Sequence, residues 1–198
     1  LAFNQADKTL WGIKHDNGYA ILVKIPEPYN QMVPVYTADF GKAMFDLDVS
    51  HDGKFLSASL SGIRGEQSLI LFDLTELEKG KKSYKTLYHL DDNTLTQFSF
   101  SVDDKYLIGT SYYTGVSNVW RVEIATGQAE LMSNTETGFF MPVQISPDSL
   151  LVLKFARDGM IPGTIPVAII KDANSIRFLG NLVHERNPVV EEWSLPAA

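Results

Sequence analysis

Short runs of apolar residues, separated by clusters of Gly, Asn, Asp and Ser, form the dominant pattern along the chain. Runs such as 19–25, 106–111 and 118–124 are rich in β-branched and aromatic residues, which favour strands. Helical periodicity is nearly absent, and a short turn around residues 75–78 is the sole helix candidate. The pattern predicts an all-β protein built from many short antiparallel strands.

One strand–turn–strand motif recurs along the chain. Its copies cover residues 46–56, 97–107 and 144–152, with a weaker copy at 2–10. The turns are of the Ser-x-Asp type, and they align on Asn4, Ser50, Ser101 and Ser146. The spacings between these positions are 46, 51 and 45 residues, which indicates an internal repeat.

Each repeat continues in the same order after its turn, with a second strand, a loop that contains glycine, a third strand and a short fourth strand. Four antiparallel strands in about 45 residues are typical of a β-propeller blade. We therefore predict four four-stranded blades, at 1–44, 45–93, 94–140 and 141–182, and an exit linker at 183–198. The alternative is a two-sheet β-sandwich, but its Greek-key connections would not regenerate one turn motif.

Two of the turns carry a family resemblance. Ser-Pro-Asp-Ser at 146–149 and Ser-His-Asp-Gly-Lys at 50–54 resemble the Ser-Pro-Asp-Gly-Lys turn of the WD40-like repeat of TolB-type propellers. The Asp-Leu-Thr at 73–75 and the Ala-Thr-Gly at 125–127 resemble a later turn of the same repeat. Departures occur at the proline and glycine positions of the motif. The departing residues are His51, Val102, Asp104 and Ser149.

The resemblance covers most of residues 1–182 and implies a propeller, usually a ring of about six to eight blades. Such propellers are common in bacterial envelope proteins and in the gating domain of prolyl-oligopeptidase-like enzymes. Because four blades are visible and the chain begins abruptly at Leu1, we expect it to be part of a longer propeller, with further blades before Leu1, or to self-associate through open blade faces. The turn residues close hairpins, so the resemblance carries over no catalytic residue.

Charge and composition narrow the classes of partner. The chain has 17 Lys and Arg residues against 24 Asp and Glu residues, a formal net charge of −7, which argues against a nucleic-acid partner. The absence of cysteine excludes disulfides, thiolate metal sites and cysteine nucleophiles. The apolar stretch at 159–170 contains two prolines and is shorter than the roughly 20 residues of a spanning helix, so we expect no direct membrane insertion.

No motif for catalysis, metal binding or cofactor binding stands out. The Gly-x-Ser-x-Gly elbow of serine hydrolases is missing, and so is the Gly-x-x-x-x-Gly-Lys phosphate loop. The four histidines fall in separate repeats or in the tail: His15, His51, His89 and His184. We therefore expect no catalytic residue, no metal and no cofactor, and no hydrolase activity in this chain.

Polar residues on the innermost strands form the one candidate site. Strand alternation places Asp46 and Asp48 on the same face of the second blade. The equivalent positions in the next two blades are Gln97 with Ser99, and Gln144. Two carboxylates beside a central channel could hold a cation or a basic segment. The alternative, which we favour, is that these side chains cap backbone groups along a hydrated channel wall.

Three functions fit these features. The leading hypothesis is a non-enzymatic propeller module of a bacterial envelope or periplasmic protein, which binds a protein or peptide or scaffolds a neighbouring domain. The second is the substrate-gating propeller of a prolyl-oligopeptidase-like serine peptidase whose catalytic domain lies outside this chain. The third is a hydrolase or lyase with its active site at the channel mouth.

Overall fold

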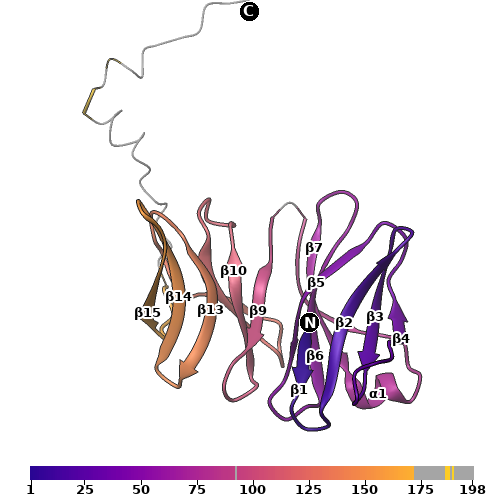
Figure 1. Cartoon of the computed structure of the whole chain (residues 1–198). Coiled ribbons are helices and arrows are strands. Elements are labelled where there is room, and N and C mark those ends of the chain that lie inside the picture. Colours follow the sequence, from indigo (N-terminus) through magenta and orange to yellow (C-terminus); the bar gives the residue numbers. More distant parts are fainter. Residues whose placement is uncertain (92, 172–185, 188, 190–198) are drawn as a thin grey trace, which may run out of the picture.

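The computed structural model describes residues 1–91, 93–171, 186, 187 and 189. These residues form four antiparallel sheets, each built from strands that follow one another in the sequence. The sheets stand side by side in an open arc, with the first and the last at opposite ends (Figure 1). We call them blades 1 to 4. The predicted all-β architecture of successive antiparallel blades is confirmed.

Blade 1 contains β1 (Ala2–Asn4), β2 (Thr9–Asp16), β3 (Tyr19–Ile25) and β4 (Val33–Thr37). Blade 2 contains β5 (Ala43–Val49), β6 (Phe55–Ser61), β7 (Gln67–Asp73), the helix α1 (Leu74–Glu78) and β8 (Lys85–Leu90). Blade 3 contains β9 (Thr96–Phe100), β10 (Tyr106–Ser111), β11 (Asn118–Glu123) and β12 (Ala129–Leu131). Blade 4 contains β13 (Phe139–Ser146), β14 (Ser149–Ala156) and β15 (Gly159–Pro166).

Blade 4 differs from the prediction because it has three strands, not four, in the described part of the chain. After β15 the chain turns toward blade 3, where the Ile170 N–H donates to the carbonyl of Leu131 at 2.8 Å. Residues 172–182 of the predicted fourth blade lie outside the described residues, as does nearly all of the predicted linker at 183–198. The predicted blade boundaries stay predictions, and β5 already begins at Ala43, before the boundary at 44/45.

The core lies between blades, in three apolar clusters. Trp11, Leu22 and Phe72 belong to the cluster between blades 1 and 2. Leu71, Phe98 and Leu107 belong to the second, and Ile108, Leu150 and Val152 to the third. A middle strand therefore buries both of its faces, which explains the nearly continuous burial of β6. Blade-to-blade packing supplies most of the hydrophobic stabilisation.

The repeated turn has the same internal bonding in blades 2 and 3. The Ser50 hydroxyl donates to Asp52 at 2.7 Å and accepts from the Phe55 N–H at 2.9 Å. Ser101 makes the equivalent bonds to Asp103 at 2.7 Å and from Tyr106 at 3.0 Å. The Lys54 ammonium beside Asp52 lowers the pKa of that carboxyl to about 2. The serine–aspartate pair thus replaces backbone partners in the hairpin, as Ser and Asp do in turns.

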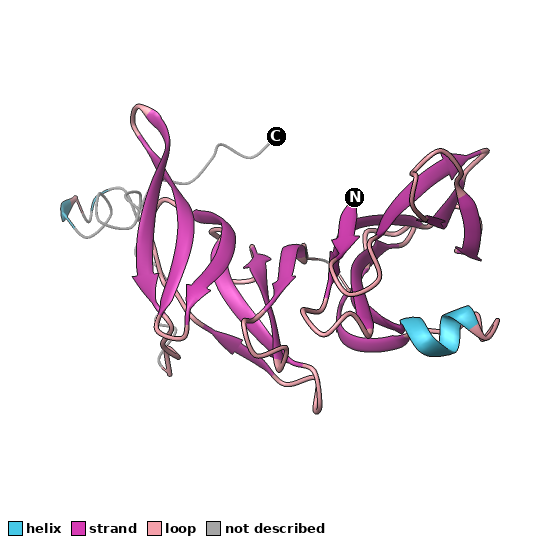
Figure 2. Ribbon diagram, turned by 60° about the horizontal axis from the view of Figure 1, so that its bottom comes forward, coloured by secondary structure: helices cyan, strands magenta, loops and turns pink. Residues whose placement is uncertain are grey.

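The short helix α1 forms where the sequence indicates, at the end of β7 (Figure 2). Asp73 caps it by accepting from the Glu76 N–H at 3.0 Å. Leu74 and Leu77 are buried in the cluster between blades 1 and 2. Within the described part of the chain, no helix has the length and apolar character needed to span a membrane.

Candidate functional site: the inner face of the arc

The inner strands of the blades are β1, β5, β9 and β13, and they line the inner edge of the arc (Figure 1). Three of them carry a β-bulge at the same place, where two residues oppose one on the next strand. The first residue of each bulge is left-handed: Asp46 with φ 52°, Gln97 with φ 60° and Met141 with φ 48°. Simple strand alternation does not reveal this bulge, which turns the side chains that follow it.

Asp46 and Asp48 both face blade 3. The Asp46 carboxylate accepts from the Gln97 N–H at 2.5 Å, and the Asp48 carboxylate accepts from the Phe100 N–H at 2.7 Å. Burial raises the pKa of Asp48, and the N–H donors of Phe100 and Val49 oppose that rise. The predicted pair is therefore brought to one side of the strand, where both carboxylates cap backbone groups of the neighbouring blade.

Gln97, Ser99 and Gln144 also bond to backbone groups. The Gln97 amide oxygen accepts from the Met141 N–H at 2.8 Å. The side chain of the first bulge residue in blades 2 and 3 therefore accepts from the N–H of the first bulge residue in the next blade. The Ser99 hydroxyl donates to the carbonyl of Pro142 at 3.4 Å. Gln144 accepts from the Val102 N–H at 3.2 Å. Among the described residues, the bonds between bulges thus run from blade 2 to blade 4, where the first bulge residue is Met141, whose thioether is only a weak acceptor.

The register corrects one predicted equivalence. Asp48 pairs with Ser57 on β6, and Ser99 pairs with Ile108 on β10. In blade 4 the residue at that position is Val143, which pairs with Leu151, and Gln144 lies one residue further along. The difference follows from the turn, because Ser146 pairs with Ser149 across only two residues, Pro147 and Asp148. An extra residue therefore remains in β13.

The bulges line a hollow of about 260 Å³ on the inner face. Asp46, Asp48, Gln97, Ser99 and Val143 are among its lining residues. A second hollow of about 410 Å³ shares Asp48, Ser99 and Val143 with it. Further lining residues of the second hollow are Phe3, Gln5, His51 and Gln144. We call the two together the inner-face hollow; its wall combines carboxylates, amides and exposed apolar side chains, and contains no Lys or Arg.

The turns of blades 2 and 3 contact each other beside this hollow. Asp104, in the turn of blade 3, accepts from the N–H groups of His51 and Asp52, each at 3.0 Å. The same carboxylate lies 2.7 Å from Nδ1 of His51. Asp104 has φ 55° at a position where the family motif has glycine, and Asp is among the residues that tolerate this conformation. An aspartate in place of that glycine is the signal that sequence reasoning could have used.

Replacing Asp104 with alanine should lower the free energy of unfolding by about 1.5–3 kcal/mol, because two N–H groups lose a charged acceptor and alanine strains a left-handed position. Asp104→Asn is the matched control, because it tolerates the backbone and keeps one acceptor oxygen, while the two N–H groups use different oxygens of Asp104. Its cost should be about half that of Asp104→Ala, because one of the two bonds is lost and the backbone is not strained. Urea denaturation followed by circular dichroism measures both. A loss for Asp104→Ala no larger than that for Asp104→Asn would show that the contact between turns contributes nothing.

The other candidate side chains of the sequence lie apart from the inner-face hollow in the described residues, except His51. No three of their His, Asp and Glu side chains gather as a metal site, and His15, His51 and His89 lie in separate places. Residues 109–115, which have the composition of a serine elbow but not its spacing, form the end of β10 and the loop after it. His184 lies outside the described residues.

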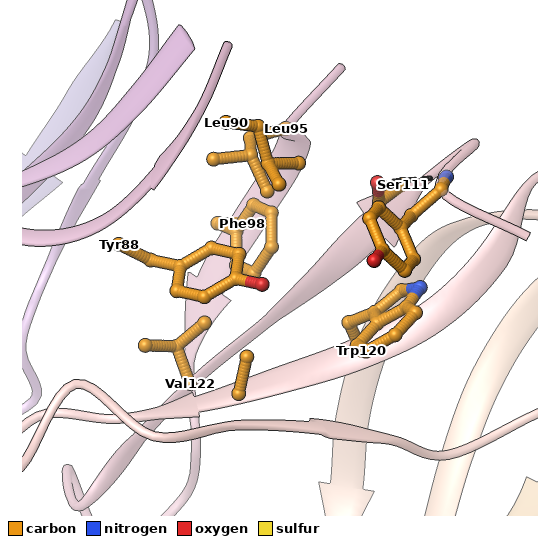
Figure 3. Close-up of a pocket in the computed structure, with 9 residues that line it drawn as sticks. Tyr88, Leu90, Leu95, Phe98, Ser111, Trp120 and Val122 are labelled. Atoms are coloured by element: carbon orange, nitrogen blue, oxygen red, sulfur yellow. Dashed lines mark hydrogen bonds between the residues drawn. The ribbon is translucent and has the colours of Figure 1, made fainter. Parts of the chain in front are cut away.

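A separate apolar pocket lies between blades 2 and 3 (Figure 3). Tyr88 and Phe98 stand on one side of it and Trp120 on the other, where the Tyr113 ring meets the indole edge to face at 5.9 Å. Its free volume of about 10 Å³ has room for no more than one water molecule. We interpret it as a junction in the packing of the two blades.

Comparison with known proteins gives a fold and no family. No protein-family model and no curated protein sequence matches the chain. TolB from Acinetobacter baumannii matches with a TM-score of 0.68 and 13% identity, over 84% of this chain and 40% of that one. Prolyl endopeptidases match with a TM-score of 0.58 and 13% identity, over 87% and 28%. An oligogalacturonate lyase in complex with manganese matches with 0.60 and 13%, over 88% and 53%.

This chain thus spans between about a quarter and about half of the length of these structures. At 13% identity the likeness shows the fold alone, and that fold is the β-propeller that the repeated turn predicts.

Proposed function

We propose that this chain is a non-enzymatic propeller module that binds a protein or peptide segment in the inner-face hollow. Its place would be the periplasm or cell envelope of a bacterium, as the resemblance to TolB-type repeats implies. The observation that carries the proposal is the convergence of three inner-strand bulges on one hollow. Their bonds to the neighbouring blade hold the wall in shape before a ligand arrives, which lowers the entropic cost of binding.

The chemistry of the hollow favours a basic segment. Asp46 and Asp48 line it, Asp104 borders it, and its wall contains no Lys or Arg to neutralise them. A carboxylate offers about four lone-pair sites, so capping one or two N–H groups leaves capacity for a Lys or Arg side chain. The exposed rings and methyl groups of Phe3 and Val143 would pack against the aliphatic stem of such a side chain. The net charge of −7 adds long-range attraction.

A second candidate is the substrate-gating propeller of a prolyl-oligopeptidase-like peptidase. The likeness to prolyl endopeptidases favours it, because the chain matches about a quarter of their length. The inner face would then meet peptide substrates on their way to a catalytic domain. The full-length gene separates the two candidates: an α/β-hydrolase domain encoded after Ala198 supports the peptidase, and a membrane or peptidoglycan-binding domain supports the envelope module.

Substituting Asp46→Asn together with Asp48→Asn should weaken the binding of a fluorescent Lys- and Arg-rich peptide about tenfold at low salt. Asparagine keeps an acceptor oxygen for the two backbone N–H groups, so the free energy of unfolding should change by less than about 1 kcal/mol. Fluorescence anisotropy measures the affinity and urea denaturation the stability.

The charge-matched control is Asp158→Asn with Glu136→Gln, which removes the same charge from exposed positions elsewhere. It should change the affinity much less. Equal weakening by both double variants would mean that only net charge matters. A stability loss above about 1 kcal/mol in the inner-face variant would make the carboxylates structural caps and defeat the binding role.

A further inference from the structure

One histidine forms part of the wall of the inner-face hollow. His51 lies in the turn between β5 and β6, and it lines the larger part of the hollow together with Asp48, Ser99 and Gln144. The His51 side chain is 60% exposed, so water can reach its imidazole. Because histidine side chains change charge between about pH 5 and pH 8, the charge of this wall depends on pH within that range.

Asp104 determines which ring nitrogen of His51 takes up the titrating proton. Nδ1 of His51 lies 2.7 Å from a carboxylate oxygen of Asp104, and an ionised carboxylate can only accept a hydrogen bond. Nδ1 therefore carries a proton in both charge states of the imidazole, and the second proton binds at Nε2. Titration thus changes Nε2 from an acceptor to a donor and adds one positive charge, while the contact between the two turns is kept.

The charged groups around His51 come from three elements. Asp104 approaches it from the turn of blade 3, and Asp48 of β5 lies close enough for the two charges to interact. In the turn of His51 itself, the Asp52 carboxylate is paired with the Lys54 ammonium at 2.9 Å, so these two charges offset each other. Asp48 and Asp104 therefore make the surroundings of a neutral His51 acidic, and protonation of the imidazole offsets the charge of one of these carboxylates.

We propose that His51 makes the inner-face hollow a pH-dependent site, which holds a basic segment while the imidazole is neutral and releases it when Nε2 gains a proton. This inference rests on the proposed function of the hollow. A neutral Nε2 can accept a hydrogen bond from a lysine, arginine or backbone N–H of the segment. A protonated Nε2 can only donate, and the charge of the imidazolium repels the cationic side chains of the segment.

Fluorescence anisotropy with an N-acetylated Lys- and Arg-rich peptide, at about pH 7.5 and about pH 5.5, tests this inference. The peptide keeps its charge over this range, so a change in affinity comes from the protein. The affinity of the wild-type chain should fall about fivefold from the higher to the lower pH. In His51→Gln the side chain can still donate to Asp104 but cannot ionise, so the affinity should fall less than about twofold. His51→Lys carries a permanent charge and should bind at about pH 7.5 as weakly as the wild-type chain does at about pH 5.5.

His89→Gln is the matched control, because His89 also lies beside a carboxylate, that of Asp91 at 3.1 Å, but is not among the residues that line the hollow. This variant should keep the fivefold fall of the wild-type chain. Burial raises the pKa of Asp48, so protonation of Asp48 also weakens binding as the pH falls. That contribution remains in His51→Gln, and the difference between this variant and the wild-type chain therefore measures the effect of His51 alone.

Two outcomes would overturn the inference in distinguishable ways. If the affinity falls equally in the wild-type chain and in His51→Gln, or if His51→Lys binds at about pH 7.5 as tightly as the wild-type chain, His51 does not control release, and the hollow remains a binding site. If the wild-type chain does not bind the peptide at about pH 7.5, the proposed function fails together with this inference. Circular dichroism at both pH values checks that the wild-type chain and all variants are folded.

Discussion

Replacing Trp11 with alanine should lower the free energy of unfolding by about 3–5 kcal/mol, because the change leaves a large cavity between two blades. Trp11 is fully buried and packs in the cluster that joins blades 1 and 2. Blades 1 and 2 should be destabilised together, because neither blade can bury its facing apolar surface without the other. Urea denaturation followed by circular dichroism at the β-sheet band measures the loss.

Trp11→Phe is the matched control for this prediction. It keeps most of the ring volume and removes an indole N–H that has no hydrogen-bond partner among the described residues, so its cost should be below about 1.5 kcal/mol. If alanine and phenylalanine have the same small effect, the packing between blades 1 and 2 contributes little to stability.

Gly127→Ala should lower the free energy of unfolding by about 3 kcal/mol, from a left-handed backbone and from a steric clash. Gly127 has φ +77°, and a Cβ there would lie 2.4 Å from the carbonyl oxygen of Leu87 in blade 2. Neither backbone can move without disturbing the packing between blades 2 and 3. The turn after β11 thus packs closely against blade 2. The same urea denaturation assay measures the loss of stability in Gly127→Ala.

Gly65 separates these two contributions. It also has a positive φ, +93°, but nothing lies within 4 Å of its Cβ position. Gly65→Ala should therefore cost only the backbone strain, about 1 kcal/mol. Equal costs at Gly127 and Gly65 would refute a steric role for the Leu87 contact.

Strands and hairpins could be predicted from the sequence because their signals are local. The residues of β3 and β10 coincide with predicted runs, and the Ser50 and Ser101 turns form as their residue types indicate. The helix α1 likewise has its cap next to it in the chain, at Asp73. In each case the residues that decide the structure lie within a few positions of one another.

The contacts between blades could not be predicted in the same way. The bulges at Asp46 and Gln97 depend on N–H groups about fifty residues away, and no pattern of apolar positions marks them. Asp104 contacts the turn of blade 2 across a similar distance. The shift of Gln144 arises from a shorter turn, which a motif alignment treats as equivalent. The residue types indicate that these side chains can cap backbone groups, but the sequence does not indicate which N–H groups they accept from.

The claim that the inner face binds a basic segment is tested most directly by photo-cross-linking from one position inside the hollow. Ser99→Cys, labelled with a benzophenone, places the probe on β9 in the wall of both parts of the inner-face hollow. Lys82→Cys places the same probe on an exposed loop of blade 2 as a control. A Lys- and Arg-rich peptide should cross-link to the probe at position 99 and not to the probe at position 82, and excess unlabelled peptide should abolish the product. Equal yields from the two positions, or a product that unlabelled peptide does not compete away, would contradict it.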